Sequence, residues 1–239
     1  MHHVVLERWS RRESTLHCRD PRAKAVALVI FLVIVATTHR SFAGAACAYF
    51  LLLVALLVWA RLPLLAVLAR AALVLPFTLV FALISVVAGD PHRALLLMGK
   101  SYLSALAVLL VVGTTPLPRL LRAFESLGAP RFLLMVAQFV YRYLFVIAEE
   151  AQHMRVAAAS RGASASPAAR FRAAAGALAV LFARSYARAE AIHRAMLARG
   201  FEGRFRLLSV LRFGWADAVF LLLAVAAPLA VRLALEAGA

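Results

Sequence analysis

The chain contains the stretch PAARFRAAAGALAVLFARSYARAEAIHRAMLARG at residues 167–200. Its larger apolar side chains recur at helical spacing along one face. Ser166 stands at the position of an N-cap, Pro167 at the first helical position, and Gly200 where a left-handed residue ends a helix. The pattern predicts one uninterrupted helix over residues 168–199, for which the rest of the chain supplies a membrane anchor.

A second long helix is predicted immediately upstream, over residues 131–161. Its first half is apolar, its second half is polar, and Gly162 ends it as Gly200 ends the other. Two similar tripeptides, Ser160-Arg161-Gly162 and Ala198-Arg199-Gly200, therefore stand at the ends of two long helices. An arginine at a helix end is often only a favourable cap, but a rigidly presented guanidinium also bonds carboxylates in pairs. Two matched ends favour docking to a partner with two similar acidic grooves, through Ser160, Arg161, Gly162, Ala198, Arg199 and Gly200.

The composition places the chain in a membrane. Of its 239 residues, 64% are hydrophobic, whereas soluble domains are nearer to half apolar. The formal net charge of +16 would suit a nucleic-acid-binding protein, but the long Leu, Val and Ala runs exclude that class and leave no nucleic-acid partner expected. Cys18 and Cys47 predict no disulfide, and the polar first residues predict no cleaved signal peptide.

Five apolar runs have the length of membrane spans, at residues 23–38, 41–60, 71–88, 94–115 and 215–235. Asp20 and Pro21 predict the start of the first helix, and Pro76 predicts a kink in the third. Because arginine is concentrated before the first run, at residues 61–70 and in residues 116–212, these segments are expected in the cytoplasm. The fold class is an all-α integral membrane protein with about five transmembrane helices and long cytoplasmic amphipathic helices. The expected parts are residues 1–115, 116–212 and 213–239.

Three smaller features concern the membrane interface. Thr115 and Pro116 predict the start of a short surface helix with an apolar stripe along Leu117, Leu120, Leu121, Phe124 and Leu127. Lys24 is expected to extend its ammonium to the inner interface, and Lys100 either serves a function or reaches the outer interface in the same way. Whether residues 131–150 and 174–183 enter the bilayer is left open.

Catalytic chemistry has one candidate group, Glu149, Glu150 and His153. Glu150 and His153 have the spacing of half a di-iron motif, which requires a second copy and further carboxylates on facing helices. The sequence has no second copy, no glycine-rich phosphate loop and no serine nucleophile motif. A charge-paired helix surface is therefore favoured over a membrane enzyme, and the chain is expected to be non-catalytic, with neither a cofactor nor a metal site of its own.

Several motifs spread over nearly the whole chain carry a family resemblance. They are Asp20-Pro21-Arg22-Ala23-Lys24, Thr114-Thr115-Pro116, Leu127-Gly128-Ala129-Pro130-Arg131, Tyr141-Arg142-Tyr143, Glu149-Glu150 and, most specifically, the run from Arg184 to Gly203. The chain resembles the transmembrane T component of energy-coupling-factor (ECF) vitamin and metal transporters, and is most similar to the CbiQ-like members that serve cobalt uptake. The two Ala-Arg-Gly signatures of that family correspond to residues 160–162 and 198–200, with Ser160 in place of the first alanine.

The resemblance implies a non-catalytic subunit of the bacterial inner membrane. Its long coupling helices would hold two ATP-binding-cassette ATPases through the two arginine motifs, while its membrane part would grip a small substrate-binding membrane protein. Opening and closing of the ATPase pair would move the coupling helices. Cobalt is the first expectation for the substrate, followed by nickel and biotin. A permease of an ordinary ABC importer, which usually has one coupling motif per chain, is a further alternative.

Overall fold

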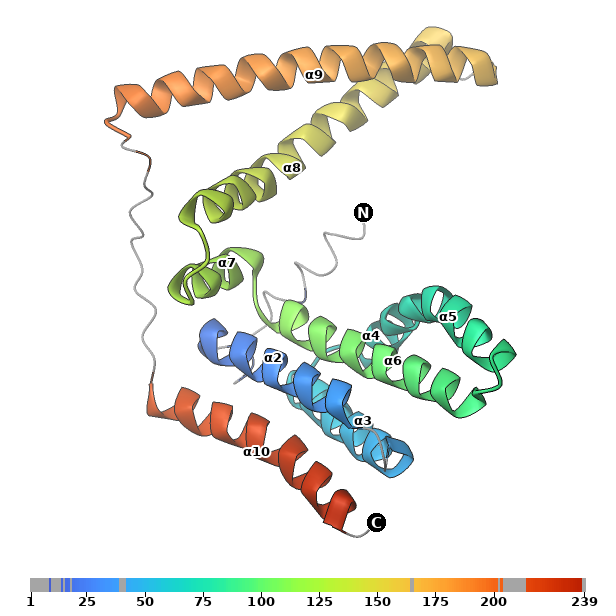
Figure 1. Cartoon of the computed structure of the whole chain (residues 1–239). Helices are drawn as coiled ribbons and strands as arrows, with labels where there is room; N and C mark the ends of the chain where they lie inside the picture. Colours follow the sequence, from blue (N-terminus) through green and yellow to red (C-terminus); the bar gives the residue numbers. More distant parts are fainter. Residues whose placement is uncertain are drawn as a thin grey trace. The chain divides into compact units, whose positions relative to one another are not determined.

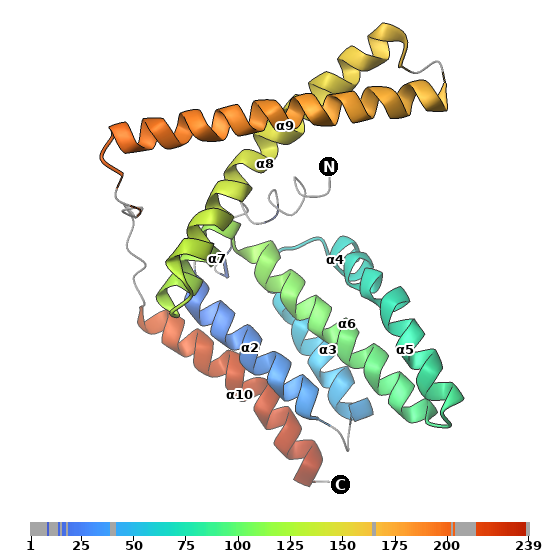
Figure 2. The ribbon, with the colours of Figure 1, turned by 45° about the horizontal axis from the view of Figure 1, so that its top comes forward.

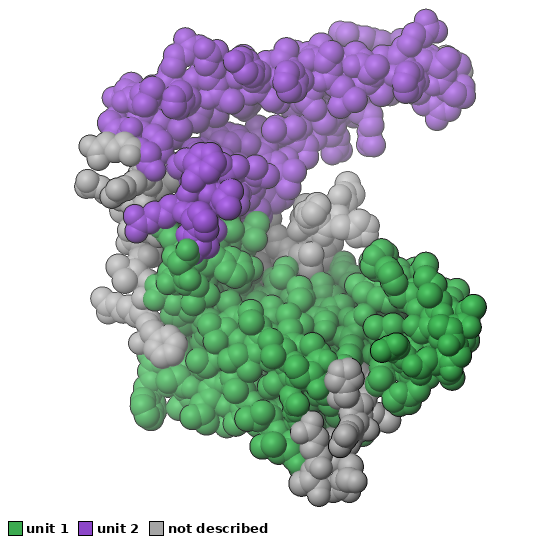
Figure 3. All heavy atoms as spheres, in the orientation of Figure 1, with its two compact units in different colours: residues 1–128, 211–239 green, residues 129–210 purple. Residues whose placement is uncertain are grey.

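A computed structural model describes residues 9, 14, 16–17, 19–38, 42–163, 166–201, 203 and 214–237. Within these residues the regular elements are all helices, with no strand, so the predicted all-α class is confirmed (Figure 1). The chain divides into two compact units, coloured in Figure 3. We call residues 1–128 with 211–239 the membrane unit and residues 129–210 the arm unit.

The membrane unit contains most of the apolar helices. They are α2 (Pro21–Thr37), α3 (Phe42–Trp59), α4 (Leu64–Ala71), the 3-10 turn η1 (Ala72–Val74), α5 (Leu75–Val87), α6 (Pro91–Thr114), α7 (Leu117–Ser126) and α10 (Trp215–Ala237). Figures 1 and 2 both show α2 beside α10, the last helix in the sequence. The opposite side of α2 packs against α6, and α6 in turn packs against α3 and α5.

The core of this unit is a continuous apolar cluster between α2, α3, α4 and α6. Val35, Leu57 and Leu106 are fully buried within it. The ring of Phe31 meets that of Tyr49 edge to face, with centroids 5.8 Å apart. The Tyr49 hydroxyl is not stranded in this apolar setting, because it lies 3.4 Å from the Thr38 hydroxyl and donates to the Pro228 carbonyl at 3.5 Å.

The predicted start of the first helix is confirmed and has an unexpected partner. Asp20 is the N-cap of α2, its carboxylate accepts from the Arg22 amide at 2.8 Å, and Pro21 occupies the first helical position. The backbone amide of Asp20 donates to a carboxylate oxygen of Asp217 at 3.0 Å, and the other oxygen of Asp217 accepts from the Gly214 amide at 3.0 Å. One buried carboxylate therefore joins the starts of α2 and α10.

Some predicted boundaries are wrong. The third apolar helix begins at Leu64 rather than residue 71, so Arg70 lies inside α4 and the preceding turn is short. The turn is tight because Arg61 adopts a positive φ of 54°. The helix is irregular where Pro76 predicts it, since η1 lies just before that proline, which lacks the amide needed to continue the α-helical bonding. At α7 the N-cap is Pro116 and not Thr115.

Four helices in the described part of the chain are long and apolar enough to cross a membrane, namely Leu64–Val87, Pro91–Thr114, Arg131–Ala163 and Trp215–Ala234. The first, second and fourth correspond to predicted spans. The third contains residues 131–150, for which the sequence left open whether they enter the bilayer. Of the other two predicted spans, α2 has 17 residues, about 26 Å of helix against a hydrocarbon core of about 30 Å, and α3 is represented by the shorter apolar helix Gly44–Trp59.

The arm unit consists of two long helices and the turn between them. They are α8 (Arg131–Ala158), the π-helical turn η2 (Ala159–Ala163) and α9 (Pro167–Ala198). The cap predicted for α9 is confirmed, because the Ser166 hydroxyl accepts from the Ala169 amide at 3.1 Å and Pro167 follows at the first helical position. Leu134 is the buried residue of α8, and α9 has none.

Candidate functional site

The second arginine motif lies at the carboxyl end of α9. The Gly200 amide donates to the Leu197 carbonyl at 2.9 Å, and the Phe201 amide donates to the Met196 carbonyl at 3.1 Å. This is the Schellman pattern, which needs a left-handed residue after the helix, and Gly200 has a φ of 76°. Arg199 is the C-cap and is exposed. The glycine thus ends the helix directly after the arginine, as predicted.

The first motif lies in the turn η2. Gly162 has a φ of 83°, which breaks the helical path one residue after Arg161. The Ser160 hydroxyl donates back to the carbonyl oxygens of Ala157 at 3.0 Å and Val156 at 3.2 Å, so it is engaged with its own helix. A Cβ atom added at Gly162 or Gly200 would meet nothing within 4 Å. Both glycines are therefore required for their backbone conformation, and the space above each is open.

The two arginines stand near opposite ends of α9. Arg161 lies in the turn η2 that precedes α9, while Arg199 follows the last residue of α9. The 32 residues of α9 span about 48 Å at 1.5 Å per residue. A partner that engages both ends must therefore present two sites at a comparable separation, which fits two copies of one subunit better than one small domain.

A groove between α8 and α9 extends from the first motif. Arg161 and Gly162 line one end of it, and the lining continues with Glu150, His153, Arg172, Arg184 and small residues of both helices. The lining thus includes three arginines but only one acidic residue, Glu150, and the Glu150 carboxylate is paired with Arg184. The groove is consequently electropositive and suits an acidic partner surface.

An ion pair links α8 and α9 where they cross. Arg184 donates to Glu150 across 34 positions of sequence. Arg188 lies in the same crossing. Arg199 is not part of this crossing, because it caps the far end of α9. On α9 itself, Glu190 and Arg194 form an ion pair at 3.5 Å that is solvent-exposed.

The alternative catalytic group gains no support from this geometry. Among the described residues no three His, Cys, Asp or Glu side chains are placed to hold a metal ion. Glu150 is engaged with Arg184, and Glu149 and His153 are exposed on the surface of α8. The favoured prediction of a charge-paired helix surface agrees with this arrangement.

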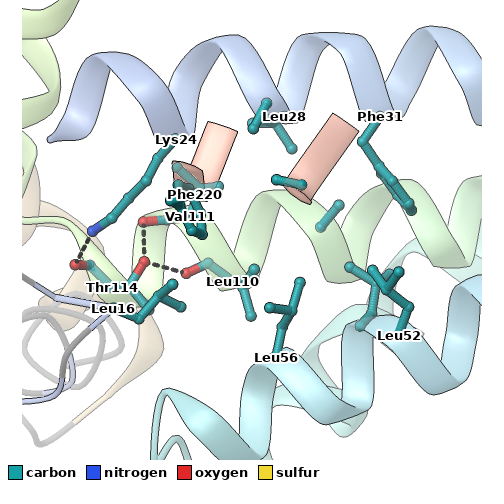
Figure 4. A pocket seen from close by; sticks show the side chains of 14 residues that line it. Leu16, Lys24, Leu28, Phe31, Leu52, Leu56, Leu110, Val111, Thr114 and Phe220 are labelled. Carbon is teal, nitrogen blue, oxygen red and sulfur yellow. Dashed lines mark hydrogen bonds between the residues drawn. The ribbon is translucent and has the colours of Figure 1, made fainter. Parts of the chain in front are cut away.

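The membrane unit has an apolar pocket between α2, α3, α6 and α10 (Figure 4). Its polar end is formed by Lys24 and Thr114, and the rest of its lining is aliphatic or phenylalanine. Lys24 is 3% exposed and donates from Nζ to the Thr114 carbonyl and the Thr115 hydroxyl, both at 3.1 Å. The expectation that Lys24 reaches the interface is therefore wrong, because its ammonium ties α2 to the end of α6.

A second set of cations lies at the carboxyl end of α2. Lys100 Nζ donates to the Ala36 carbonyl at 2.8 Å, and Arg232 donates to the Thr37 hydroxyl at 2.7 Å. α2 has no basic residue in its own last turn. Positive charge near the end of a helix is favourable to its dipole, so α6 and α10 supply what α2 lacks. Sequence patterns give no sign of this pairing, since the partners are 64 and 195 positions apart.

Comparison with known proteins identifies the family. The family model of CbiQ, described as cobalt transport protein, matches residues 12–208. The chain belongs to this family. The matched residues include α8, α9 and both arginine motifs. The resemblance to CbiQ-like members is thereby confirmed, and membership of a transport protein family together with the apolar helices makes this a membrane protein.

Two relatives match shorter stretches. An uncharacterised protein of Methanocaldococcus jannaschii is 29% identical over 117 residues, which are 49% of this chain and 44% of that protein. The cobalt transport protein CbiQ of Rhodobacter capsulatus is 33% identical over 96 residues, which are 40% of this chain and 39% of that protein. The matched part of the chain spans less than half the length of either relative.

Proposed function

We propose that this CbiQ family member is the T component of an ECF-type importer, with cobalt as the transported substrate. In this role the chain performs no chemistry. It holds two ATPase subunits at Arg161 and Arg199 and transmits their movement to a small membrane protein that binds the substrate. We place the chain in the bacterial inner membrane, with the arm unit on the cytoplasmic side.

The observation that carries the proposal is the placement of two exposed arginines near opposite ends of one helix. Each guanidinium is followed by a glycine with positive φ, so the backbone turns away and leaves the side chain at the tip. A movement of the ATPases would turn α9 and change the angle at which it crosses α8 near Glu150 and Arg184.

Cobalt is proposed because the family is described as a cobalt transport protein and one relative carries that name. Nickel and biotin are the alternatives for this chain. The substrate site itself is assigned to the partner protein. Uptake of labelled cobalt, nickel and biotin by cells that contain the complete complex distinguishes the three substrates.

The docking proposal is tested by co-purification of the tagged chain with its ATPase subunits. Arg161→Glu and Arg199→Glu reverse the charge at each tip, and we expect each to weaken the association and the double variant to abolish it. Charge-assisted bidentate bonds are lost and repulsion from an acidic groove is added. ATP binding by the isolated ATPase subunits is measured as a control and shows that these partners remain folded.

Two other exposed arginines supply the matched controls. Arg155→Glu on α8 and Arg194→Glu on α9 make the same charge change one to two helical turns before each docking arginine. We expect both to retain the ATPases. Co-purification of the Arg161→Glu, Arg199→Glu double variant at the parental level would refute docking through the tips, and equal loss in the controls would show only a general need for positive charge.

A further inference from the structure

The outer face of α9 has an apolar stripe that no other described helix covers. It consists of Phe171, Leu178, Phe182 and Tyr186, which are exposed by 75%, 66%, 75% and 68%. Spacings of seven, four and four residues bring these side chains to one face of the helix. Three large aromatic rings on one side of a single helix are costly to leave in water, so this face has an occupant in the cell.

The stripe points away from α8. The residues of α9 that line the main groove toward α8 include Ala173, Ala177, Val180 and Arg184, which follow their own helical spacing on the opposite side. A second groove between α8 and α9 is lined by residues that include Arg155 of α8 and Arg170 of α9. Phe171, Phe182 and Tyr186 line neither groove, and Leu178 is among the residues that line the second. The stripe is therefore not part of the packing that joins α8 to α9.

Positive charge borders the stripe on both sides. Arg172 lines one groove beside α8 and Arg170 lines the other, so the two guanidinium groups lie on opposite flanks of Phe171. Over its whole length α9 has five arginines and one glutamate. An apolar stripe edged by arginine on both sides is the pattern of a helix that lies in the interface of an anionic membrane.

The chain tethers one end of α9 to a membrane span. The span candidate Trp215–Ala234 follows Arg199 after 15 residues. At no more than about 3.6 Å per residue, this connection limits how far that end of α9 can move from the membrane. A tethered helix meets the lipid surface at high effective concentration, so even a weak affinity suffices.

We propose that α9 docks by the Phe171–Tyr186 stripe onto an anionic lipid surface, with Phe171, Leu178 and Phe182 inserted among the acyl chains and the arginines on phosphates. Such docking would confine the sliding of α9 to the plane of the membrane. The proposal does not depend on the identity of the ATPases or the substrate. It therefore stands or fails separately from the function proposed above.

The test is spin labelling of the full chain with the native cysteines removed by Cys18→Ser and Cys47→Ser. One label is placed at Phe182→Cys in the stripe. The matched label is placed at Ala187→Cys, which is also exposed and lies about 140° around the helix. Each protein is reconstituted in phosphatidylcholine vesicles with and without phosphatidylglycerol, and collision with oxygen is compared with collision with a water-soluble nickel chelate.

We expect the ratio of oxygen to nickel collision to be several-fold higher at residue 182 than at residue 187 in vesicles that contain phosphatidylglycerol. Without this lipid, or with Arg170→Gln and Arg172→Gln together, the difference should shrink. Equal nickel access at both positions would overturn the proposal. Shielding of residue 182 from both reagents would also overturn it, because that result would mean that a protein surface covers the stripe.

Discussion

The membrane unit and the arm unit are both built from helices, but different interactions hold them together. In the membrane unit α2 packs against α3, α6, α7 and α10, the core is continuous, and buried polar groups join distant segments. In the arm unit Leu134 is the buried residue of α8, α9 has no buried residue, and one ion pair joins the helices. The membrane unit is therefore fixed by its own packing, whereas the crossing of the arms is free to respond to partners.

The largest expected effect concerns the buried Lys24 side chain, which links α2 to the end of α6 in the membrane unit. Lys24→Met keeps most of the side-chain volume but removes both hydrogen bonds, which leaves the Thr114 carbonyl and the Thr115 hydroxyl without this donor in a buried site. We expect the free energy of unfolding to fall by about 3 kcal/mol, since hydrogen bonds to charged groups contribute ~1.5–3 kcal/mol each. Denaturant unfolding of the purified chain in detergent measures the change.

The arm unit supplies the control for this prediction. Arg188→Met removes an exposed positive charge from α9, and surface substitutions usually change stability by less than about 0.5 kcal/mol. If Lys24→Met were as stable as the parent, buried polar ties would not distinguish the membrane unit from the arms.

A second prediction concerns the carboxylate that joins the starts of α2 and α10. Asp217→Ala removes the acceptor for the Asp20 and Gly214 amides, and we expect a loss of about 1–2 kcal/mol, as for other helix caps. Asp90→Ala is the control, because Asp90 also lies at the start of a helix, as the N-cap residue of α6, but its side chain caps no amide. Equal changes in unfolding midpoint for the two variants would contradict the role of Asp217.

Two glycines of the arm unit give effects of opposite sign. Gly200→Ala forces an alanine to a φ of 76° and should destabilise the end of α9 by about 1 kcal/mol. Gly176→Ala lies within the helix in open space and should stabilise it by up to about 1 kcal/mol. Hydrogen exchange of the α9 amides reports both effects locally. Faster exchange in both variants would mean that α9 is held by contacts rather than by its own helical preference.

The smallest expected effect is on the crossing of the arms. Glu150→Gln removes a partly exposed ion pair, which contributes at most about 1 kcal/mol and is screened by salt. Stability should hardly change, but the distribution of distances between spin labels at Ala159 and Ala174 should broaden. An unchanged distribution at low salt would show that the crossing does not depend on this pair.

The membrane unit shows where sequence reasoning succeeds and where it stops. The class of the fold follows from the apolar runs, and the start of α2 follows from Asp20 and Pro21, because these signals act within one turn of helix. The partners of Lys24 and Asp217 do not follow, since they are 90 and 197 positions away. The earlier start of the third helix does not follow from the sequence, because an arginine beside an apolar run is typical of a membrane interface, whereas the Arg70 guanidinium lies 4.2 Å from the centre of the Trp9 ring.

The same division holds in the arm unit. The sequence by itself determined two long helices, their stops at Gly162 and Gly200, and the two arginines at the tips, because the left-handed conformation after a helix selects glycine locally. The tertiary structure was needed to show that Glu150 and Arg184 meet and that the aromatic stripe of α9 points away from α8. These facts depend on how two helices cross, and side-chain spacing along one helix carries no information about the position of another.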